Sequence, residues 1–321
     1  MRTARAQRGV ALVTAVMIVA IAAAIAVQIA FAHQIWFRQM ENVADRSATD
    51  WLRRGALHWA SVALIEDAAQ GNTVDHLGEK WAMGLPVLPV EGGAIKVSVE
   101  DAQSRFNLNS VGGKDAASLA NVQVLNRLLG VLQLDPQLAN AVVDWTDTDI
   151  VAGPGGAEDV DYLNGKPPYR AANRLMASVD EVRLVRGFDA KTVAALSPYV
   201  TVLPVANSAI NVNTASPVVL AALVNGLDMP TAERVAKDLR GNPIRNPNEF
   251  AGRLAGIPPP TGRFDVKTEY FLITLDTSIG RHERRSEALL QRSGTAAGTT
   301  TTWLWHRPLP LTGLDEADDS K

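Results

Sequence analysis

Residues 9–32 read GVALVTAVMIVAIAAAIAVQIAFA, an apolar stretch long enough to anchor the rest of the chain. From Val10 to Ala32 the only polar residues are Thr14 and Gln28. As a helix this run would be roughly 34 Å long at about 1.5 Å per residue, enough to cross a hydrocarbon core of about 30 Å. The sequence therefore predicts one membrane-spanning helix at residues 10–32.

The nine residues before this helix are basic: they contain Arg2, Arg5 and Arg8 and no acid. Because basic flanks stay on the cytoplasmic side, we expect everything after Ala32 to lie outside the cytoplasm. A cleaved secretory signal peptide has an apolar stretch of about 7 to 15 residues, shorter than this one. The run itself leaves a plain signal anchor open as an alternative.

The helix is predicted to continue beyond the membrane. Apolar residues recur at helical spacing, and the opposite face is charged, which indicates an amphipathic end packed on a globular domain. We interpret the tryptophans on this stretch as core or interface anchors. The recurring apolar residues are Trp36, Met40, Val43, Ala44, Trp51, Leu52, Trp59 and Val62.

Composition narrows the possible functions. The net charge of −3 gives no general attraction to nucleic acid, and the absence of cysteine excludes disulfides and thiolate metal sites. The five histidines lie outside any recognisable catalytic motif, and no phosphate-binding glycine loop is present. We therefore predict a protein that is not an enzyme.

The remaining chain predicts an α+β fold. AIKVSVEDA at 94–102 alternates like a strand, and further strands are expected at 268–279, 284–294 and 300–307, whereas 71–93 is expected to be loop. A sheet divided in this way pairs residues near 95 with residues near 270. We therefore expect a globular domain at 33–104 and 263–307, interrupted by an insertion at 105–262 and followed by a tail at 308–321.

The insertion is predicted to be mainly helical and to contain an internal repeat. RFNLNSV at 105–111 is echoed by AINVNTA at 209–215, and paired short helices follow each copy. Ser110 and Thr214 are expected to cap those helices. The pairs resemble SAM-like or helix-hairpin-helix units, about 105–205 and 209–262.

Helix-hairpin-helix units suggest a second functional hypothesis, a membrane-anchored DNA-binding or DNA-uptake protein. The two hairpins read GVLQLDPQ at 130–137 and NGLDMPTA at 225–232. Both lack the Gly-x-Gly turn and carry an aspartate, which would repel a phosphate. We therefore expect no nucleic-acid partner.

One dense polar segment, residues 144–173, reads DWTDTDIVAGPGGAEDVDYLNGKPPYRAAN. Six carboxylates fall in it with few basic residues nearby, so they repel one another unless solvent or a cation screens them. Oxygen ligands around a glycine-proline loop favour Ca²⁺, although the spacing is not that of an EF-hand. A solvated acidic loop is the alternative.

The join between Gly9 and the apolar helix resembles a class III, type IV pilin-like signal. In such signals a prepilin peptidase cuts after glycine and leaves the helix on the mature protein, so the resemblance implies a leader at 1–9 and a new terminus at Val10. In major subunits the fifth mature residue is a glutamate whose charge is thought to neutralise a neighbour's amino terminus. Here that position is Thr14, which suggests a subunit at the filament tip.

Several segments in this order resemble one family, the minor pseudopilin general secretion pathway protein K of type II secretion systems. They are the glycine-ended leader, VEGGAIKVSVEDAQSRFNLN at 90–109, the acidic segment, LMASVDEVRLVRGFD at 175–189 and INVNTASPVVLAAL at 210–223. The resemblance implies a pilin-like long N-terminal helix packed on a small antiparallel sheet, with a large helical insertion.

The same resemblance implies the site, the partners and the location. The family is known to bind calcium in its helical insertion, so Asp147, Asp149, Glu158 and Asp159 are expected as ligands of a structural Ca²⁺, with Asp144 and Asp161 in reserve. The I-type and J-type minor pseudopilins and other pseudopilins are the expected partners. The location implied is the bacterial inner membrane, single-pass, with the C-terminal domain in the periplasm and a role in initiating or limiting pseudopilus assembly.

Overall fold

A single long helix dominates the computed structural model, which describes residues 4–70, 74–294 and 298–310. Helix α1 (Ala4–Ala69) runs for 66 residues without a break, as the spacing of its apolar residues predicts. Its apolar part has a mean hydropathy of 2.9 over 18 residues, none of them buried within the chain. Residues 1–3 of the expected leader and 311–321 of the expected tail lie outside the described ranges.

A five-stranded antiparallel sheet packs against the last turns of α1. Its order is β1-β2-β7-β8-β9. Strand β2 pairs with β7 so that Ile95 lies opposite Thr277, which joins two parts of the chain that the insertion separates. The bounds are β1 (Leu85–Val90), β2 (Gly93–Asp101), β7 (Tyr270–Ile279), β8 (His282–Ser293) and β9 (Thr300–Leu309).

Two expectations about the sheet were wrong. Residues 71–93 were expected to be loop, but β1 lies among them at the edge of the sheet. An edge strand tolerates Pro86 and Pro89, because proline has no N–H to donate to a neighbouring strand. The exposed side chains of β1 give no burial pattern to read from sequence. Strand β9 continues to Leu309, into residues expected to be tail, because it stays paired with β8 up to Arg285.

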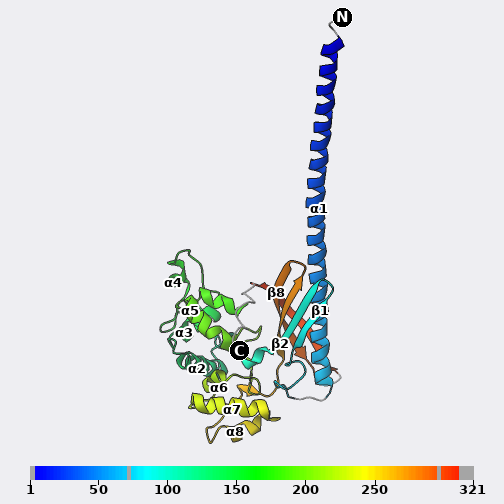
Figure 1. Cartoon of the computed structure of the whole chain (residues 1–321). Helices are drawn as coiled ribbons and strands as arrows, with labels where there is room; N and C mark the ends of the chain where they lie inside the picture. The colour runs from blue at the N-terminus through cyan, green and yellow to red at the C-terminus, as the bar shows by residue number, and fades with distance from the viewer. Residues whose placement is uncertain (1–3, 71–73, 295–297, 311–321) are drawn as a thin grey trace.

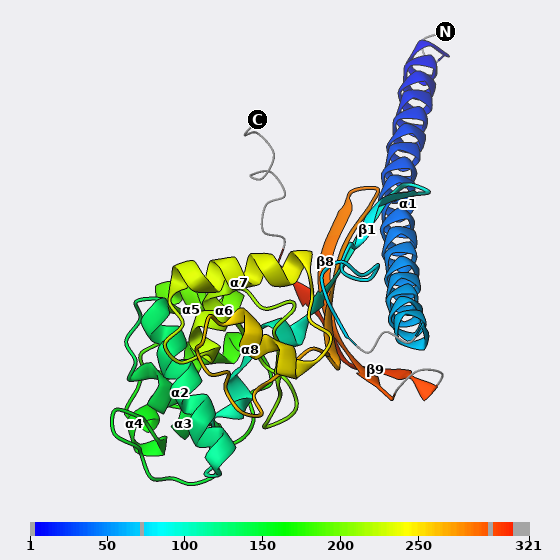
Figure 2. The same ribbon diagram turned by 90° about the horizontal axis from the view of Figure 1, so that it is seen from below.

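The helical insertion lies on the far side of the sheet from α1, as both views show (Figures 1 and 2). Its apolar core is a single cluster drawn from residues 106–266. The helices are α2 (Ala116–Val131), α3 (Leu138–Thr146), α4 (Asp159–Leu163), α5 (Ala190–Leu196), α6 (Pro217–Leu223), α7 (Met229–Gly241) and α8 (Phe250–Arg253).

Short parallel strand pairs close each half of the insertion. Strand β3 (Phe106–Asn107) pairs with β4 (Val200–Thr201), and β5 (Ile210–Asn211) pairs with β6 (Phe264–Asp265). Because β6 completes the second pair, the insertion extends a few residues past the expected boundary at 262. The two halves thus share a plan: strand, helical hairpin, returning strand.

The repeated asparagines explain the sequence echo. Asn109 grips the backbone of Met176, donating to its oxygen at 3.1 Å and accepting from its nitrogen at 2.7 Å. Asn213 grips Ile244 in the same way, at 3.0 and 3.1 Å. A buried backbone unit outside a helix or strand needs such a partner. The second asparagine of each repeated segment therefore holds a distant loop of the same half of the insertion in place.

The expected helix caps were wrong. Helix α2 is capped by Asp115, which accepts from the Ser118 nitrogen, and α6 by Ser216, which accepts from the Val219 nitrogen. Ser110 is the last residue of a 3₁₀ turn (Leu108–Ser110), several residues before α2 begins. The helices start later than their apolar pattern suggests because a turn follows each asparagine pair.

Helix α1 and the sheet form a second, smaller core. Ala56, Leu57, Ala60 and Leu64 on α1 are buried against the sheet, where Phe271 is fully covered. The aromatic residues nearer the apolar N-terminal part of α1 behave differently, because Trp36 is 62% exposed and Trp51 is 69% exposed. These two were expected to be core or interface anchors, and within the single chain they are not core.

Candidate metal site

The acidic segment forms a pocket of carboxylates at the end of α3. Asp144 lies in the last turn of this helix, and Asp147 follows its final residue. Glu158 immediately precedes α4. The glycine-proline loop between them folds the two helix ends together, and all three side chains are buried.

Three of the four expected ligands converge. Asp147, Asp149 and Glu158 each offer an oxygen, and these oxygens lie within 4.8 Å of one another. Asp149 is the most accessible of the three, and Lys114 reaches its carboxylate at 2.5 Å. Among the residues that the structure describes, the Lys114 ammonium is the positive charge that pairs with this group of three carboxylates.

The other predicted carboxylates support the loop instead. Asp159 binds Arg170 at 2.8 Å and accepts from the Ala171 nitrogen at 3.0 Å, so it holds the segment that follows α4. Asp161 binds Arg186 at 2.9 Å. Asp159 was expected to be a ligand, and here it is directed to these partners.

Asp144 contacts the backbone of the glycine-proline loop. It accepts from the Gly153 nitrogen at 3.0 Å, and a Cβ at Gly156 would lie 1.9 Å from its carboxylate. The loop therefore approaches this carboxylate so closely that glycine is required at 156. The sequence marks this requirement as the Gly-Pro-Gly-Gly run at 153–156.

Glu158 carries the clearest sign that this cluster suits a cation. It is 4% exposed, and neither carboxylate oxygen has a hydrogen-bond partner among the described residues. Buried polar oxygens are rarely left unpaired, because desolvation costs about 1–3 kcal/mol per group and more for a charge. Two such buried carboxylate oxygens fit the ligands of a cation.

Asn173 belongs to the same pocket, although it was not predicted as a ligand. Its Nδ2 donates to the Asp149 backbone oxygen at 2.9 Å, whereas its Oδ1 is buried without a partner in the described parts of the chain. Its φ of +44° is a conformation that asparagine tolerates better than most residues. An amide oxygen is also a calcium ligand.

The charges of the pocket favour a bound cation. Burial, with the charge of Asp149 beside it, raises the pKa of Asp147 to about 6. Burial raises the pKa of Glu158 as well, and Asp147 adds to the effect. The hydrogen bond from Lys114 lowers the pKa of Asp149. The raised pKa values of Asp147 and Glu158 thus come first from burial and then from neighbouring carboxylates, and a bound cation would offset both effects.

The residues present fit Ca²⁺. Asp147, Asp149, Glu158 and Asn173 would hold it, with oxygen donors only, as this hard cation requires. A bound ion would screen the three carboxylates and fix the loop between α3 and α4. Trp145, beside Asp144 on α3, packs edge-on against Tyr162 of α4 at 5.2 Å between ring centres, and its indole donates to Glu181 at 2.9 Å.

The hairpin aspartates have a structural role. Asp228 accepts from the Thr231 nitrogen and caps α7, and Asp135 accepts from the Gln137 nitrogen before α3. The second functional hypothesis depended on these hairpins. Their acids stabilise the turns between paired helices.

Two family models match the insertion, both described as type II secretion system protein K, at residues 104–205 and 210–267. Type II secretion system protein K of Pseudomonas aeruginosa is 34% identical over 302 residues, covering 90% of each chain. The chain belongs to the type II secretion system protein K family. The corresponding protein of Aeromonas hydrophila is 32% identical and covers 91% of this chain and 95% of its own length.

A solved structure agrees with this assignment. The crystal structure of the GspK-GspI-GspJ complex from the type 2 secretion system of enterotoxigenic Escherichia coli contains a similar chain, with a TM-score of 0.76 and 25% identity. The match covers 85% of the present chain and 99% of that one. The α+β fold expected from the sequence and the family resemblance are therefore confirmed.

Proposed function

We propose that this chain is the tip subunit of the pseudopilus, which starts or limits assembly of the filament that exports folded proteins across the outer membrane. Its role is structural rather than catalytic. The observation that carries the proposal is the placement of a large helical insertion on the opposite side of the sheet from a long, largely uncovered helix (Figure 1).

The uncovered part of α1 supports assembly with related subunits. Beyond the membrane stretch it presents Met40, 52% exposed, and Val43, 61% exposed, at the level where contact with the sheet begins through Asn42 and His282. Exposed apolar residues in a row mark an interaction surface. Helices of the I-type and J-type minor pseudopilins are the partners we propose for it, and the solved GspK-GspI-GspJ complex, one chain of which is similar to this protein, supports this choice.

Thr14 supports a terminal position. Its hydroxyl donates to the backbone oxygens of Val10 at 3.1 Å and Ala11 at 2.9 Å, so its polar group is satisfied inside the same helix. A carboxylate at this place would need a cation from a neighbour in the bilayer. A subunit with threonine here requires no such neighbour above it.

Maturation and location complete the proposal. Prepilin peptidase would cut after Gly9, the helix would remain in the inner membrane, and the globular part would lie in the periplasm. Mass spectrometry of the membrane-extracted chain should give a terminus at Val10. An intact Met1, or a terminus beyond Ala32, would contradict the proposed processing.

Co-purification tests the partner surface. Tagged full-length chain, extracted from membranes in detergent, should retain the I-type and J-type subunits of the same organism. Val43→Asn should reduce their recovery several-fold, whereas Glu41→Asn, on the opposite face of α1, should not. Equal recovery with both variants would mean that this face is not the interface.

Labelling tests the terminal position. Gold particles directed to a C-terminal tag should mark one end of sheared pseudopili. Labels distributed along the filaments would contradict a tip subunit, even if the partners co-purify.

A further inference from the structure

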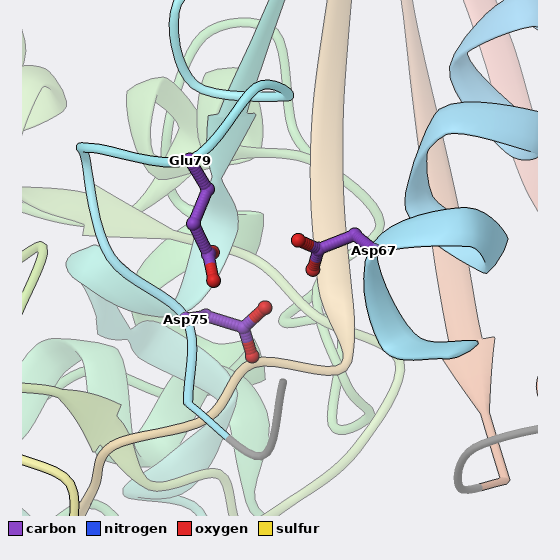
Figure 3. Close-up of side chains that lie close together, drawn as sticks. All are labelled: Asp67, Asp75 and Glu79. Atoms are coloured by element: carbon purple, nitrogen blue, oxygen red, sulfur yellow. The ribbon is translucent and has the colours of Figure 1, made fainter. Parts of the chain in front are cut away.

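A second group of carboxylates lies where α1 ends, far from the acidic loop of the insertion. Asp67 belongs to the last turn of α1, and Asp75 and Glu79 lie in the segment that leads to β1. One oxygen from each lies within 4.8 Å of the other two. Figure 3 shows the three side chains directed toward a common point.

Glu79 is directed into this cluster, and in the described part of the chain one of its oxygens has no hydrogen-bond partner. The residue is 6% exposed. Its Oε2 accepts from the Trp81 indole at 2.6 Å and from the His76 backbone nitrogen at 3.1 Å, which fixes the carboxylate. Its Oε1 has no hydrogen-bond partner within residues 4–70, 74–294 and 298–310. The His76 ring nitrogen Nε2 lies 3.9 Å from this oxygen, beyond hydrogen-bond distance.

One arginine serves two of the three acids. Arg292, on β8, binds Asp67 at 3.2 Å and Asp75 at 2.5 Å, and its guanidinium lies 4.8 Å from the centre of the Phe271 ring. Asp75 also accepts from the Thr268 nitrogen at 2.7 Å. Asp75 and Glu79 are buried beside each other, so among the described residues the charge of Arg292 leaves this group of three carboxylates with a net negative charge.

We propose that Asp67, Asp75 and Glu79 form a binding site for a divalent cation of the calcium type. Two positive charges, added to that of Arg292, would balance the three carboxylates. All the donors are oxygens, which hard cations such as Ca²⁺ prefer. This site belongs to the pilin-like domain and is independent of the tip function and of the ion proposed for the acidic loop.

The site would connect three parts of the fold. Asp67 lies at the end of α1, and Arg292 lies on β8. The backbone oxygen of Asp75 accepts from Asn211 at 3.0 Å, which links the cluster to the second half of the insertion. An ion here would therefore hold the long helix against the sheet near the junction with the insertion.

A proton is the competing occupant. Burial, with the charge of Asp67, raises the pKa of Glu79 to about 7, so a proton on Glu79 would also relieve the repulsion. The two occupants are distinguished by whether the protein takes up a metal ion that Glu79 is needed to hold.

Ion counting tests the proposal. Purified full-length chain in detergent is dialysed to equilibrium against radioactive Ca²⁺, and the ions bound per chain are counted. Glu79→Gln should bind one ion fewer than the wild type. The control Glu91→Gln, an exposed acid in the turn between β1 and β2, should bind the same number. An unchanged count in Glu79→Gln would overturn the proposal in favour of the proton.

A third variant distinguishes this site from the ion site in the acidic loop. Glu158→Gln removes a ligand of the acidic loop, and it should keep the ion that Glu79→Gln loses. The amide oxygen that Glu79→Gln introduces can still accept from Trp81 and His76, so this variant should retain its fold, which near-ultraviolet circular dichroism checks.

Luminescence provides a readout that needs no change at Glu79. Terbium replaces Ca²⁺ in oxygen sites and emits when a nearby indole is excited, and the Trp81 indole touches Glu79. In the Glu158→Gln chain, Tb³⁺ should emit on tryptophan excitation, and excess Ca²⁺ should remove the signal. Trp145→Phe in that background should retain the signal. Absence of emission in both chains would overturn the proposal.

Discussion

Thr214 donates its hydroxyl to Asp101 at 2.6 Å, across the junction between the insertion and the sheet. Asp101 ends β2 and is 3% exposed, and Thr214 belongs to the second sequence echo. The same carboxylate accepts from Asn211 at 2.9 Å and from the Thr268 hydroxyl at 2.5 Å. A buried acid held by hydroxyls and an amide therefore joins the two parts of the molecule.

Removal of this hydroxyl should destabilise the junction. Thr214→Val keeps the shape of the side chain but leaves Asp101 with one donor fewer in a buried place, at a cost of about 1–3 kcal/mol. Urea unfolding of the full-length chain, followed by tryptophan fluorescence, measures the loss. Thr300→Val, at an exposed position of β9, should change little. Equal effects at both positions would show that the hydrogen bond contributes no stability.

The stability of the junction should fall as the pH rises. Burial raises the pKa of Asp101 from 3.8 to about 6, so the folded protein holds this proton more tightly than the unfolded chain. The contribution is present below pH 4 and is lost between pH 4 and 6, by about 3 kcal/mol at about 1.4 kcal/mol per pKa unit.

Asp101→Asn isolates that contribution from other acids that titrate in the same range. Unfolding free energies measured from pH 4 to 7 should decline less steeply for the variant than for the wild type. Parallel curves would mean that Asp101 is not the group responsible.

The two halves of α1 outside the membrane should respond differently to truncation. Leu64 is fully buried against the sheet, and Leu64→Ala should cost about 3 kcal/mol of unfolding free energy. Trp51→Ala removes a side chain that is 69% exposed and should leave stability nearly unchanged. The larger loss for Trp51→Ala would contradict the packing described for α1.

Calcium should stabilise the insertion through the acidic loop. An ion present at about 100 times its dissociation constant adds about 2.7 kcal/mol to the folded state. The melting temperature of the full-length chain should rise on adding Ca²⁺ and return with chelator. The rise should be smaller in Glu158→Gln than in the control Glu233→Gln, an exposed acid on α7. Equal shifts would indicate that the loop binds no ion.

Local patterns were sufficient to predict the long helix and most of the sheet. The apolar spacing from Val10 through Val62 is visible without any contact partner, and so is the alternation in β2 and β7. Strand β1 could not be predicted in this way, because an exposed edge strand with prolines has neither alternation nor strong propensity.

The sequence by itself determined that the chain has an apolar helix long enough to cross a membrane, a divided sheet, a repeated helical insertion and a run of acids, because periodicity and composition are local properties. Only the tertiary structure decided which acids meet. In the folded chain Asp159 pairs with Arg170, and Asn173 donates to the Asp149 backbone oxygen. Glu79 lies beside Asp67. Such encounters depend on how distant segments pack, and residue spacing along a chain does not encode them.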